Sequence, residues 1–254
     1  MPETSEKVAT AACPEGDEIT LTPAQDILEQ VRAFEGYLSG TELNEYDRTH
    51  QVRLIETFRR IAHLVRPGLS VVELGGMSRI ANYFGDSCGM AVRDYTDDLR
   101  DPIKLDSAAF DIVLMLEVLE HLNDRHTPAS PITEIAMYTG SGAISCLQEA
   151  NRILRPGGYL VLTTPNAASV DTLGRTLLKM HPFQYEPHVR EYAPADVKYL
   201  AKLAGFHIQA ATTFFSWNEL PGYRREVLLK AIGDLGYDTA DRGDDAFYLL
   251  SKLA

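Results

Sequence analysis

The sequence predicts an α/β protein built on a doubly wound, largely parallel sheet. A short β-branched segment, Ser70–Leu74, runs into two glycines and then into a helix-like pattern at Ile80–Phe84. The continuous apolar run Phe110–Leu116 has the pattern of a central parallel strand that is covered on both faces. Predicted helices and strands alternate from there onward, which is typical of a sheet with helices on both sides.

Composition limits the class of partner. The chain has 254 residues, of which 45% are hydrophobic and 24% charged, as expected of one large globular domain. Its net charge of −12 disfavours nucleic-acid binding, which needs clustered Lys and Arg. No apolar run approaches the roughly 20 residues that cross a bilayer. We therefore expect a small-molecule or protein partner, no nucleic acid and no membrane.

The cysteines and the N-terminal residues indicate the cellular compartment of the protein. Cys13, Cys88 and Cys146 are far apart and lack Cys-x-x-Cys spacing, which disfavours a zinc site and a disulfide framework. The first residues are charged and contain no apolar signal-peptide core. These features favour a reducing, cytoplasmic location.

The N-terminal part is expected to be helical after a polar, flexible leader at residues 1–20, which is either disordered or a lid that orders on binding. Thr22 and Pro23 are typical of a helix start, so a helix is predicted from Pro23 to Leu38. Apolar residues at helical spacing predict a second helix over Glu45–Val65. We expect one domain over 21–254, with helices at 21–66.

The glycine turn has the pattern of a nucleotide-type cofactor site. After it, a weak strand at Gly89–Val92 leads into an acidic cluster. Asp94 lies roughly twenty residues beyond the turn, where a carboxylate on the second strand can bind the two hydroxyls of a ribose. Asp98 is a competing candidate, and both residues could instead belong to a solvated acidic loop.

The remaining elements follow in order. Residues 123–143, rich in Pro and Gly, are interpreted as an insertion at the C-terminal rim of the sheet, where loops commonly shape a substrate pocket. Helices are predicted at Ser145–Leu154, Leu173–Met180, Pro194–Ala204 and Tyr223–Ile232, and strands at Tyr159–Thr164, Phe206–Phe214 and Ala246–Lys252.

Three blocks carry a resemblance to a known family. They are Glu73–Gly76, Phe110–Leu122 and Glu149–Asn166. Together they resemble the class I S-adenosylmethionine-dependent methyltransferases. The branch that methylates small molecules is the most similar, since the pattern near the end of the domain in that branch is also present here, in His188–Tyr192 and Ala204–Phe206. The resemblance covers roughly residues 45–254.

The resemblance implies a Rossmann-like, seven-stranded sheet with the last strand antiparallel, helices on both faces and an N-terminal helical lid. It implies S-adenosylmethionine as cofactor and S-adenosylhomocysteine as product. By matching position, the main chain at Gly75 and Gly76 would approach the methionine part of the cofactor, and Glu73 would orient the turn and meet the amino end. Asp94 or Asp98 would bind the ribose. The sulfonium side would be lined by Met115, Leu116 and Glu117.

The chain departs from the family pattern in two places. Met77 and Arg79 stand where the family usually has further glycines, so bulky side chains are expected near the pocket. The segment between Asp94 and Asp111 is short for a helix and a strand, so the third strand is expected to be a stub.

The candidate catalytic residues are histidines. A general base is needed only if the acceptor must lose a proton. His188 and His121 are the candidates by position, although His188 could cap the following turn and His121 could hold backbone beneath the cofactor. His181 is expected in an exposed loop. A metal held by His181, Glu186 and His188 is not expected, because these residues lack regular spacing.

Two hypotheses of function remain. The first is methyl transfer by in-line displacement to an O, N or C atom of a small metabolite, such as a sugar nucleotide or a secondary metabolite. A nicotinamide dehydrogenase is disfavoured, because Gly75–Arg79 does not complete the Gly-x-Gly-x-x-Gly pattern. The second is a non-catalytic binding or scaffold protein whose cofactor site is filled by Met77 and Arg79. A homodimer is the assembly we consider.

Overall fold

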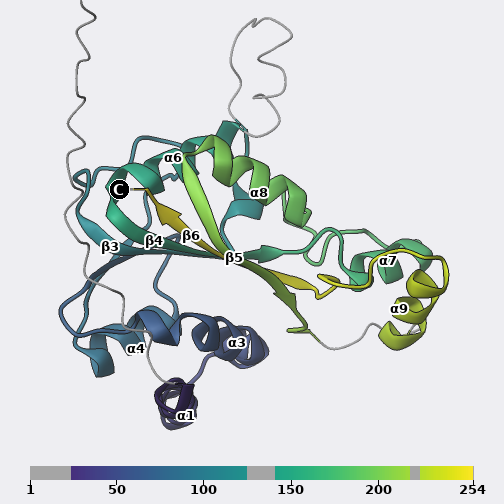
Figure 1. The fold of residues 1–254 in the computed structure, drawn as a ribbon, viewed down its shortest axis with the longest axis horizontal. Helices are drawn as coiled ribbons and strands as arrows, with labels where there is room; N and C mark the ends of the chain where they lie inside the picture. The colour runs from purple at the N-terminus through teal and green to yellow at the C-terminus, as the bar shows by residue number, and fades with distance from the viewer. Residues whose placement is uncertain (1–23, 125–140, 218–223, 254) are drawn as a thin grey trace, which may run out of the picture.

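The computed structural model describes residues 24–124, 141–217 and 224–253. Its centre is a six-stranded sheet with the order β2-β1-β3-β4-β6-β5 (Figure 1). The neighbouring pairs among β1 to β4 are parallel, and β6 is antiparallel to both β4 and β5. The strands are β1 Ser70–Leu74, β2 Ala91–Tyr95, β3 Phe110–Leu116, β4 Leu154–Pro165, β5 Phe206–Phe214 and β6 Asp245–Lys252. The expected antiparallel last strand is confirmed.

Helices cover both faces of the sheet, as expected. In Figure 1, α6 and α8 lie on one face, and α1, α3 and α4 lie on the other. The helices are α1 Ala24–Gly40, α2 Glu45–Thr49, α3 Gln51–Ile61, α4 Arg79–Cys88, α6 Ser141–Ile153, α7 Val170–Leu177, α8 Pro194–Leu203 and α9 Arg225–Asp234, with 3-10 turns η1 Ala62–Leu64 and η2 Leu119–His121.

The two-residue period of the central strands divides the core into two layers. Val113 and Met115 of β3 belong to the cluster that packs against α6 and α8. Ile112 and Leu114 belong to the cluster under α1, α3 and α4. Successive side chains of a strand point to opposite faces, and burial on both faces explains why β3 is apolar from Ile112 to Leu116.

The family's third strand, which would make the sheet seven-stranded and was expected as a stub, is not formed in the described stretch 96–109. Side chains of α6 bind the backbone there in place of a neighbouring strand. Arg152 donates to the carbonyl oxygens of Ile103 and Leu105 at 2.7 and 2.9 Å, and Glu149 accepts from the amide of Ile103 at 2.7 Å. The sheet therefore ends at β2, because the polar groups that a third strand would pair are already satisfied.

The N-terminal helices differ from the prediction at one point. The helix expected over Glu45–Val65 is divided at His50, which ends α2 and begins α3 with a non-helical backbone. The break turns α2 toward the sheet edge where β1 and β3 end. α1 packs outside α3 and α4, with Phe34 fully buried against Phe58. These helices form a wall of the molecule, and their action as a lid stays a prediction.

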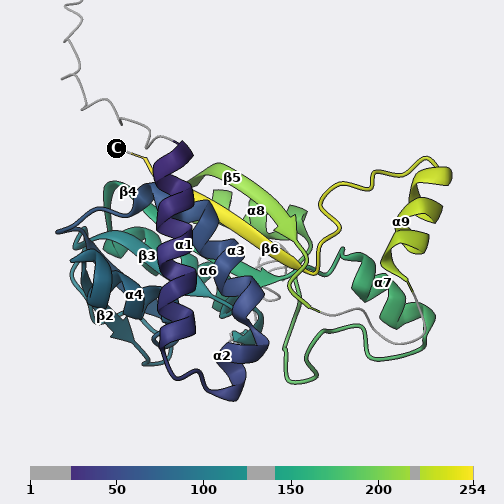
Figure 2. The same cartoon turned by 90° about the horizontal axis from the view of Figure 1, so that it is seen from below.

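Helices α7 and α9 pack against each other beyond the ends of β5 and β6, to the side of the sheet (Figure 2). α7 begins three residues before the expected helix start, because Ser169 caps it: its Oγ accepts from the amide of Thr172 at 3.0 Å. Arg225 ties α9 to Asp171 of α7 and to Asp244.

Two sequence expectations lie outside the described residues. These are the flexible leader at 1–20 and most of the rim insertion at 123–143. Among the described residues, no helix combines the length and the apolar character needed to span a bilayer.

Candidate functional site

Two adjoining cavities open at one edge of the sheet, where β1, β3 and β4 end and β6 begins. The first has a volume of about 340 Å³ and lies over the glycine turn after β1. The second, of about 420 Å³, lies beyond the end of β3. Tyr46, Arg53 and Glu117 line both cavities and form their junction. Parallel sheets of this type bind ligands outside the carboxyl ends of their strands.

The glycine turn forms the floor of the first cavity. Gly75 and Gly76 have φ angles of +102° and +124°, a region that other residues rarely adopt. A Cβ on Gly75 would lie 2.7 Å from Cγ2 of Val118, whereas a Cβ on Gly76 would meet no atom within 4 Å. Gly75 thus packs against the protein, and Gly76 presents bare backbone to the cavity.

Glu73 lies directly beneath this turn. Its side chain is buried, and Oε2 accepts from the amide of Ser78 at 2.6 Å. Burial raises the pKa of Glu73 to about 8, and the nearby Asp94 adds to the rise. Ser78 in turn caps α4, since its Oγ accepts from the amide of Ala81. The carboxylate therefore fixes the turn and lines the cavity.

The three residues at the end of β3 have different positions. Leu116 and Glu117 line the first cavity. Met115 is fully buried in the core on the α6 side of the sheet, so the structure does not place its side chain on the sulfonium side. The reason is the alternation of the strand, which sends the side chains of Met115 and Leu116 to opposite faces.

A buried group of charges lies at the junction, and of its members the sequence prediction included only Glu117. Arg53 lies 3.1 Å from Oε2 of Glu117, and it also donates to the hydroxyl of Tyr46 at 2.8 Å. Burial opposes its charge, but Glu117, Asp245 and Tyr46 outweigh that effect and raise its pKa. Glu120 and Asp245 are fully buried nearby, and burial raises their pKa well above the usual range.

Met77 and Arg79 leave the first cavity open. Arg79 lines it but is drawn toward α2, where its Nε lies 2.7 Å from Oδ2 of Asp47. A further nitrogen of Arg79 donates to the carbonyl of Glu42. The side chain therefore connects α4 to the N-terminal wall and does not fill the space over the turn.

The two ribose candidates have different surroundings. Asp94 lies on β2 opposite Glu73 in the parallel register and is exposed. Asp98 forms an ion pair with Arg100 at 2.6 Å and also accepts from the amide of that residue. Asp94 thus keeps an accessible carboxylate beside the cavity floor.

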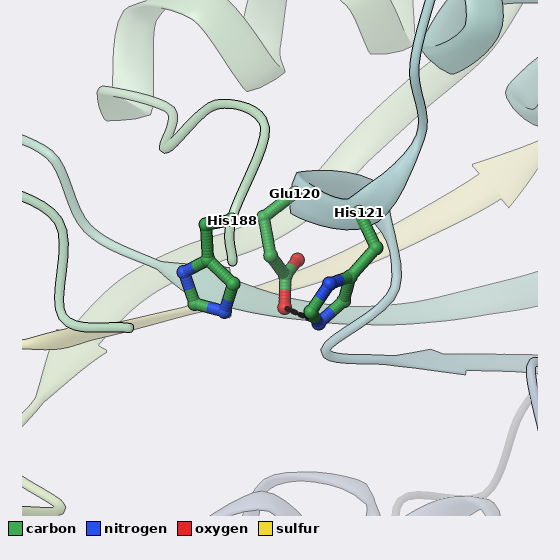
Figure 3. A group of neighbouring side chains, drawn as sticks. All are labelled: Glu120, His121 and His188. Carbon is green, nitrogen blue, oxygen red and sulfur yellow. Dashed lines mark ion pairs between the residues drawn. The ribbon is translucent and has the colours of Figure 1, made fainter. Parts of the chain in front are cut away.

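The second cavity brings together both candidate catalytic histidines. His121 and His188 lie with their ring centroids 4.8 Å apart, on either side of the Glu120 carboxylate (Figure 3). Nδ1 of His188 lies 2.9 Å from Oε1 of the buried Glu191. Burial and the neighbouring His188 lower the pKa of His121.

Aromatic residues form much of the remaining wall, and the sequence prediction missed most of them. Tyr46, His50, Tyr185 and Trp217 all line the second cavity. The ring of His50 lies 4.1 Å from Tyr46 and 4.6 Å from Trp217. Burial lowers the pKa of His50 to about 4, so this ring is neutral at physiological pH.

Comparison with known proteins defines the class. A family model described as a methyltransferase domain matches residues 46–211, more than half of the chain. The chain therefore belongs to this methyltransferase family. No curated protein sequence matches it.

Solved structures agree on the fold. A SAM-dependent methyltransferase from Archaeoglobus fulgidus has a TM-score of 0.52 at 14% identity, over 82% of this chain and 98% of that one. A complex of the Haloferax volcanii Trm112 methyltransferase activator with a putative methyltransferase has a TM-score of 0.51 at 12% identity, over 92% of this chain and 98% of that one. The phosphoethanolamine N-methyltransferase 2 of Haemonchus contortus, in complex with S-adenosyl-L-methionine, has a TM-score of 0.50 at 13% identity, over 88% of this chain and 57% of that one. At these identities the likeness concerns the fold.

The chain is a SAM-dependent methyltransferase, and S-adenosylmethionine is its cofactor. The residues of the first cavity fit that molecule. Bare backbone at Gly76 allows close approach. The Glu73 carboxyl group, protonated at neutral pH in the ligand-free chain, would ionise beside a cationic amino group and complement it. Glu117 Oε1 is buried without a hydrogen-bond partner among the described residues.

Proposed function

We propose that this enzyme transfers the methyl group of S-adenosylmethionine to an O, N or C atom of a small metabolite bound in the second cavity. The observation that carries the proposal is the junction of the two cavities at Tyr46, Arg53 and Glu117. A methyl donor in one and an acceptor in the other would meet there. A volume of about 420 Å³ lies within the range of small-molecule sites.

The cofactor would be held by the first cavity. Glu73, Gly75 and Gly76 would hold its methionine part, Leu116 and Glu117 its sulfonium side, and Asp94 its ribose. When bound, S-adenosylmethionine supplies a methyl group on a sulfonium, which is already a reactive donor. The protein therefore has to align the acceptor and exclude water.

The N-terminal wall supports the exclusion of water. Asp47 is buried and pairs with Arg79, which holds α2 over the glycine turn. At the junction itself, the hydroxyl of Tyr46 accepts a hydrogen bond from Arg53. Together these contacts close one side of both cavities.

His188 is the side chain proposed to take a proton from the acceptor. Its Nδ1 is bound to Glu191, which leaves Nε2 as the nitrogen available to a ligand. Glu191 also accepts from the amide of Gln184 at 2.5 Å, so its carboxylate is fixed. An acceptor hydroxyl would lose its proton to Nε2 as its oxygen forms the new bond to the methyl carbon, while the carbon–sulfur bond breaks and leaves S-adenosylhomocysteine. His121 lies beside this position and would contact the acceptor.

The test is a search for the acceptor with the full chain. S-adenosylmethionine labelled in its methyl group is incubated with panels of amines, phenols and sugar nucleotides, and label in the small-molecule fraction is measured. We expect label in one chemical class, and a loss of at least tenfold for His188→Ala. Transfer of label to proteins, with none to any small molecule, would overturn the proposal.

A further inference from the structure

Glu120, His121 and His188 place three metal-binding groups together in the second cavity (Figure 3). Each offers one ligand atom, and these atoms all lie within 4.8 Å of one another. Glu120 and His121 follow β3 in the turn η2, and His188 comes from the loop before α8. The sequence predicted no metal, because residues so far apart show no ligand spacing.

Only one of the two carboxyl oxygens of Glu120 has a hydrogen-bond partner among the described residues. Its Oε2 accepts from the hydroxyl of Thr164 at 2.9 Å. Its Oε1 is buried and has no hydrogen-bond partner in the described part of the chain; Nε2 of His121 lies 3.9 Å away. The side chain is 0% exposed. A buried carboxylate oxygen without a partner is costly, and a cation would remove that cost.

His188 has the environment of a metal-binding histidine. Such a residue usually directs its second ring nitrogen to a carboxylate, which fixes the ring and the tautomer. Glu191 fills this role at 2.9 Å from Nδ1, and its side chain is fully buried. The Val189 amide donates to the backbone carbonyl of Glu120 at 2.9 Å, so the two segments are joined next to the cluster.

Further buried carboxyl groups lie next to the cluster. Glu117, Glu120 and Asp245 are carboxylates that interact with one another and with Arg53. Glu117 and Asp245 also have buried oxygens without hydrogen-bond partners among the described residues. A cation beside the cluster would therefore find further oxygen acceptors within the same buried group.

We propose that Glu120, His121 and His188 bind a divalent transition-metal cation, with an open coordination position toward the second cavity. Two imidazoles and one carboxylate suit zinc, manganese, iron or cobalt, and three protein ligands with an open position are typical of a reactive site. The binding of the cation does not depend on the proposed function, whereas its effect on the acceptor does. An acceptor hydroxyl bound to the cation would lose its proton to water more readily, so the cation would replace His188 as the activating group.

The test is metal binding by the untagged full chain after treatment with a chelator. Zinc and manganese chloride are titrated calorimetrically, and manganese also by the loss of its free-ion electron paramagnetic resonance signal. We expect one equivalent bound per chain with a Kd of about 10 μM or tighter. Glu120→Gln and His188→Ala should each weaken binding at least tenfold.

His181→Ala is the matched control, because this exposed histidine belongs to the same loop and contacts Phe183 outside the cluster. It should bind as the unmodified chain does. The proposal is overturned if neither cation binds, or if Glu120→Gln and His188→Ala bind as tightly as His181→Ala. Titration with S-adenosylhomocysteine, performed in parallel, separates this failure from a failure of the cofactor site.

Discussion

The two cavities differ in how the chain builds them. The floor of the first is one continuous segment, Glu73–Arg79, and side chains from α2, α3 and the end of β3 complete its walls. The second is made by side chains from α2, α3, the end of β3, the loop around Tyr185, and Trp217. A site that depends on backbone geometry leaves a local pattern in the sequence, whereas a site that depends on converging side chains does not. The cofactor end was therefore predicted as a local pattern, whereas at the second cavity His121 and His188 were predicted and most of the aromatic wall was missed.

The junction residue Arg53 should show the largest effect of substitution. Arg53→Met would leave Glu117 buried without its ionic partner, and the free energy of unfolding should fall by about 3–5 kcal/mol. Urea unfolding measures this change. Arg59→Met on the same helix removes a half-exposed pair with Glu56 and should cost less than about 1 kcal/mol. Equal losses in the two variants would contradict the importance of the junction.

At the cofactor end, Glu73→Ala removes the carboxylate that accepts from Ser78 and faces the cavity. We expect the Kd for S-adenosylhomocysteine to rise about a hundredfold, which corresponds to about 2.7 kcal/mol. Calorimetric titration gives the value, and circular dichroism checks that the fold is kept. The control Glu56→Ala, on α3, should bind normally. An unchanged Kd in Glu73→Ala would remove the turn from the cofactor site.

The same carboxyl group predicts a pH dependence of stability. The pKa of Glu73 is about 8 in the folded chain and 4.5 by its ordinary value. Between these values the folded state holds the proton that the unfolded state releases, so this contribution to stability falls as pH rises toward 8. The unmodified chain should lose stability relative to Glu73→Gln by up to about 1.4 kcal/mol per pH unit. The expectation is refuted if the free energies of unfolding of the two proteins change with pH in parallel between pH 5 and 8.

The ribose assignment is tested by a pair of variants. Asp94→Ala should weaken S-adenosylhomocysteine binding about tenfold, because the carboxylate lies beside the cavity floor in register with Glu73. Asp98→Ala should change the Kd by less than about twofold, since that carboxylate is bound to Arg100. The reverse order would assign the ribose to Asp98, and equal small effects would exclude both residues.

The smallest effect on cofactor binding is expected at the far end of the second cavity. His188→Ala should leave the Kd for S-adenosylhomocysteine within about twofold, because this side chain lines the second cavity. The thermal midpoint should be recorded as well, since the pair with Glu191 is lost. A tenfold weaker cofactor binding would show that the two cavities are not separate sites.

The sequence predicted the elements whose signals are local. The run Phe110–Leu116 is the buried central strand, and Phe206–Phe214 is β5 with the same bounds. The turn at Gly75 and Gly76 was predictable because their positive φ angles restrict the residue type. Antiparallel insertion of the last strand followed from the family resemblance rather than from the residues.

The features that the sequence did not predict depend on distant contacts. The short segment between Asp94 and Asp111 predicted that the family's third strand is reduced, but not the contacts that replace it: Arg152 and Glu149, on α6, bind the backbone around Ile103. Arg53 belongs to a helix that was interpreted as simple core packing, yet it is buried beside Glu117. Arg53 and Thr57 are four residues apart and therefore share one face of the helix, and both are buried there. This pair of polar residues was the signal in the sequence for a site on that face.

The most direct test of the account is calorimetric titration of the full chain with S-adenosylmethionine and S-adenosylhomocysteine. The open cavity over Gly76, with Arg79 drawn away to Asp47, predicts binding of both with a Kd of about 1 μM, or about 8 kcal/mol. An absence of both heat and thermal stabilisation with either compound would contradict it. In that case the cavity over the glycine turn would not be a cofactor site.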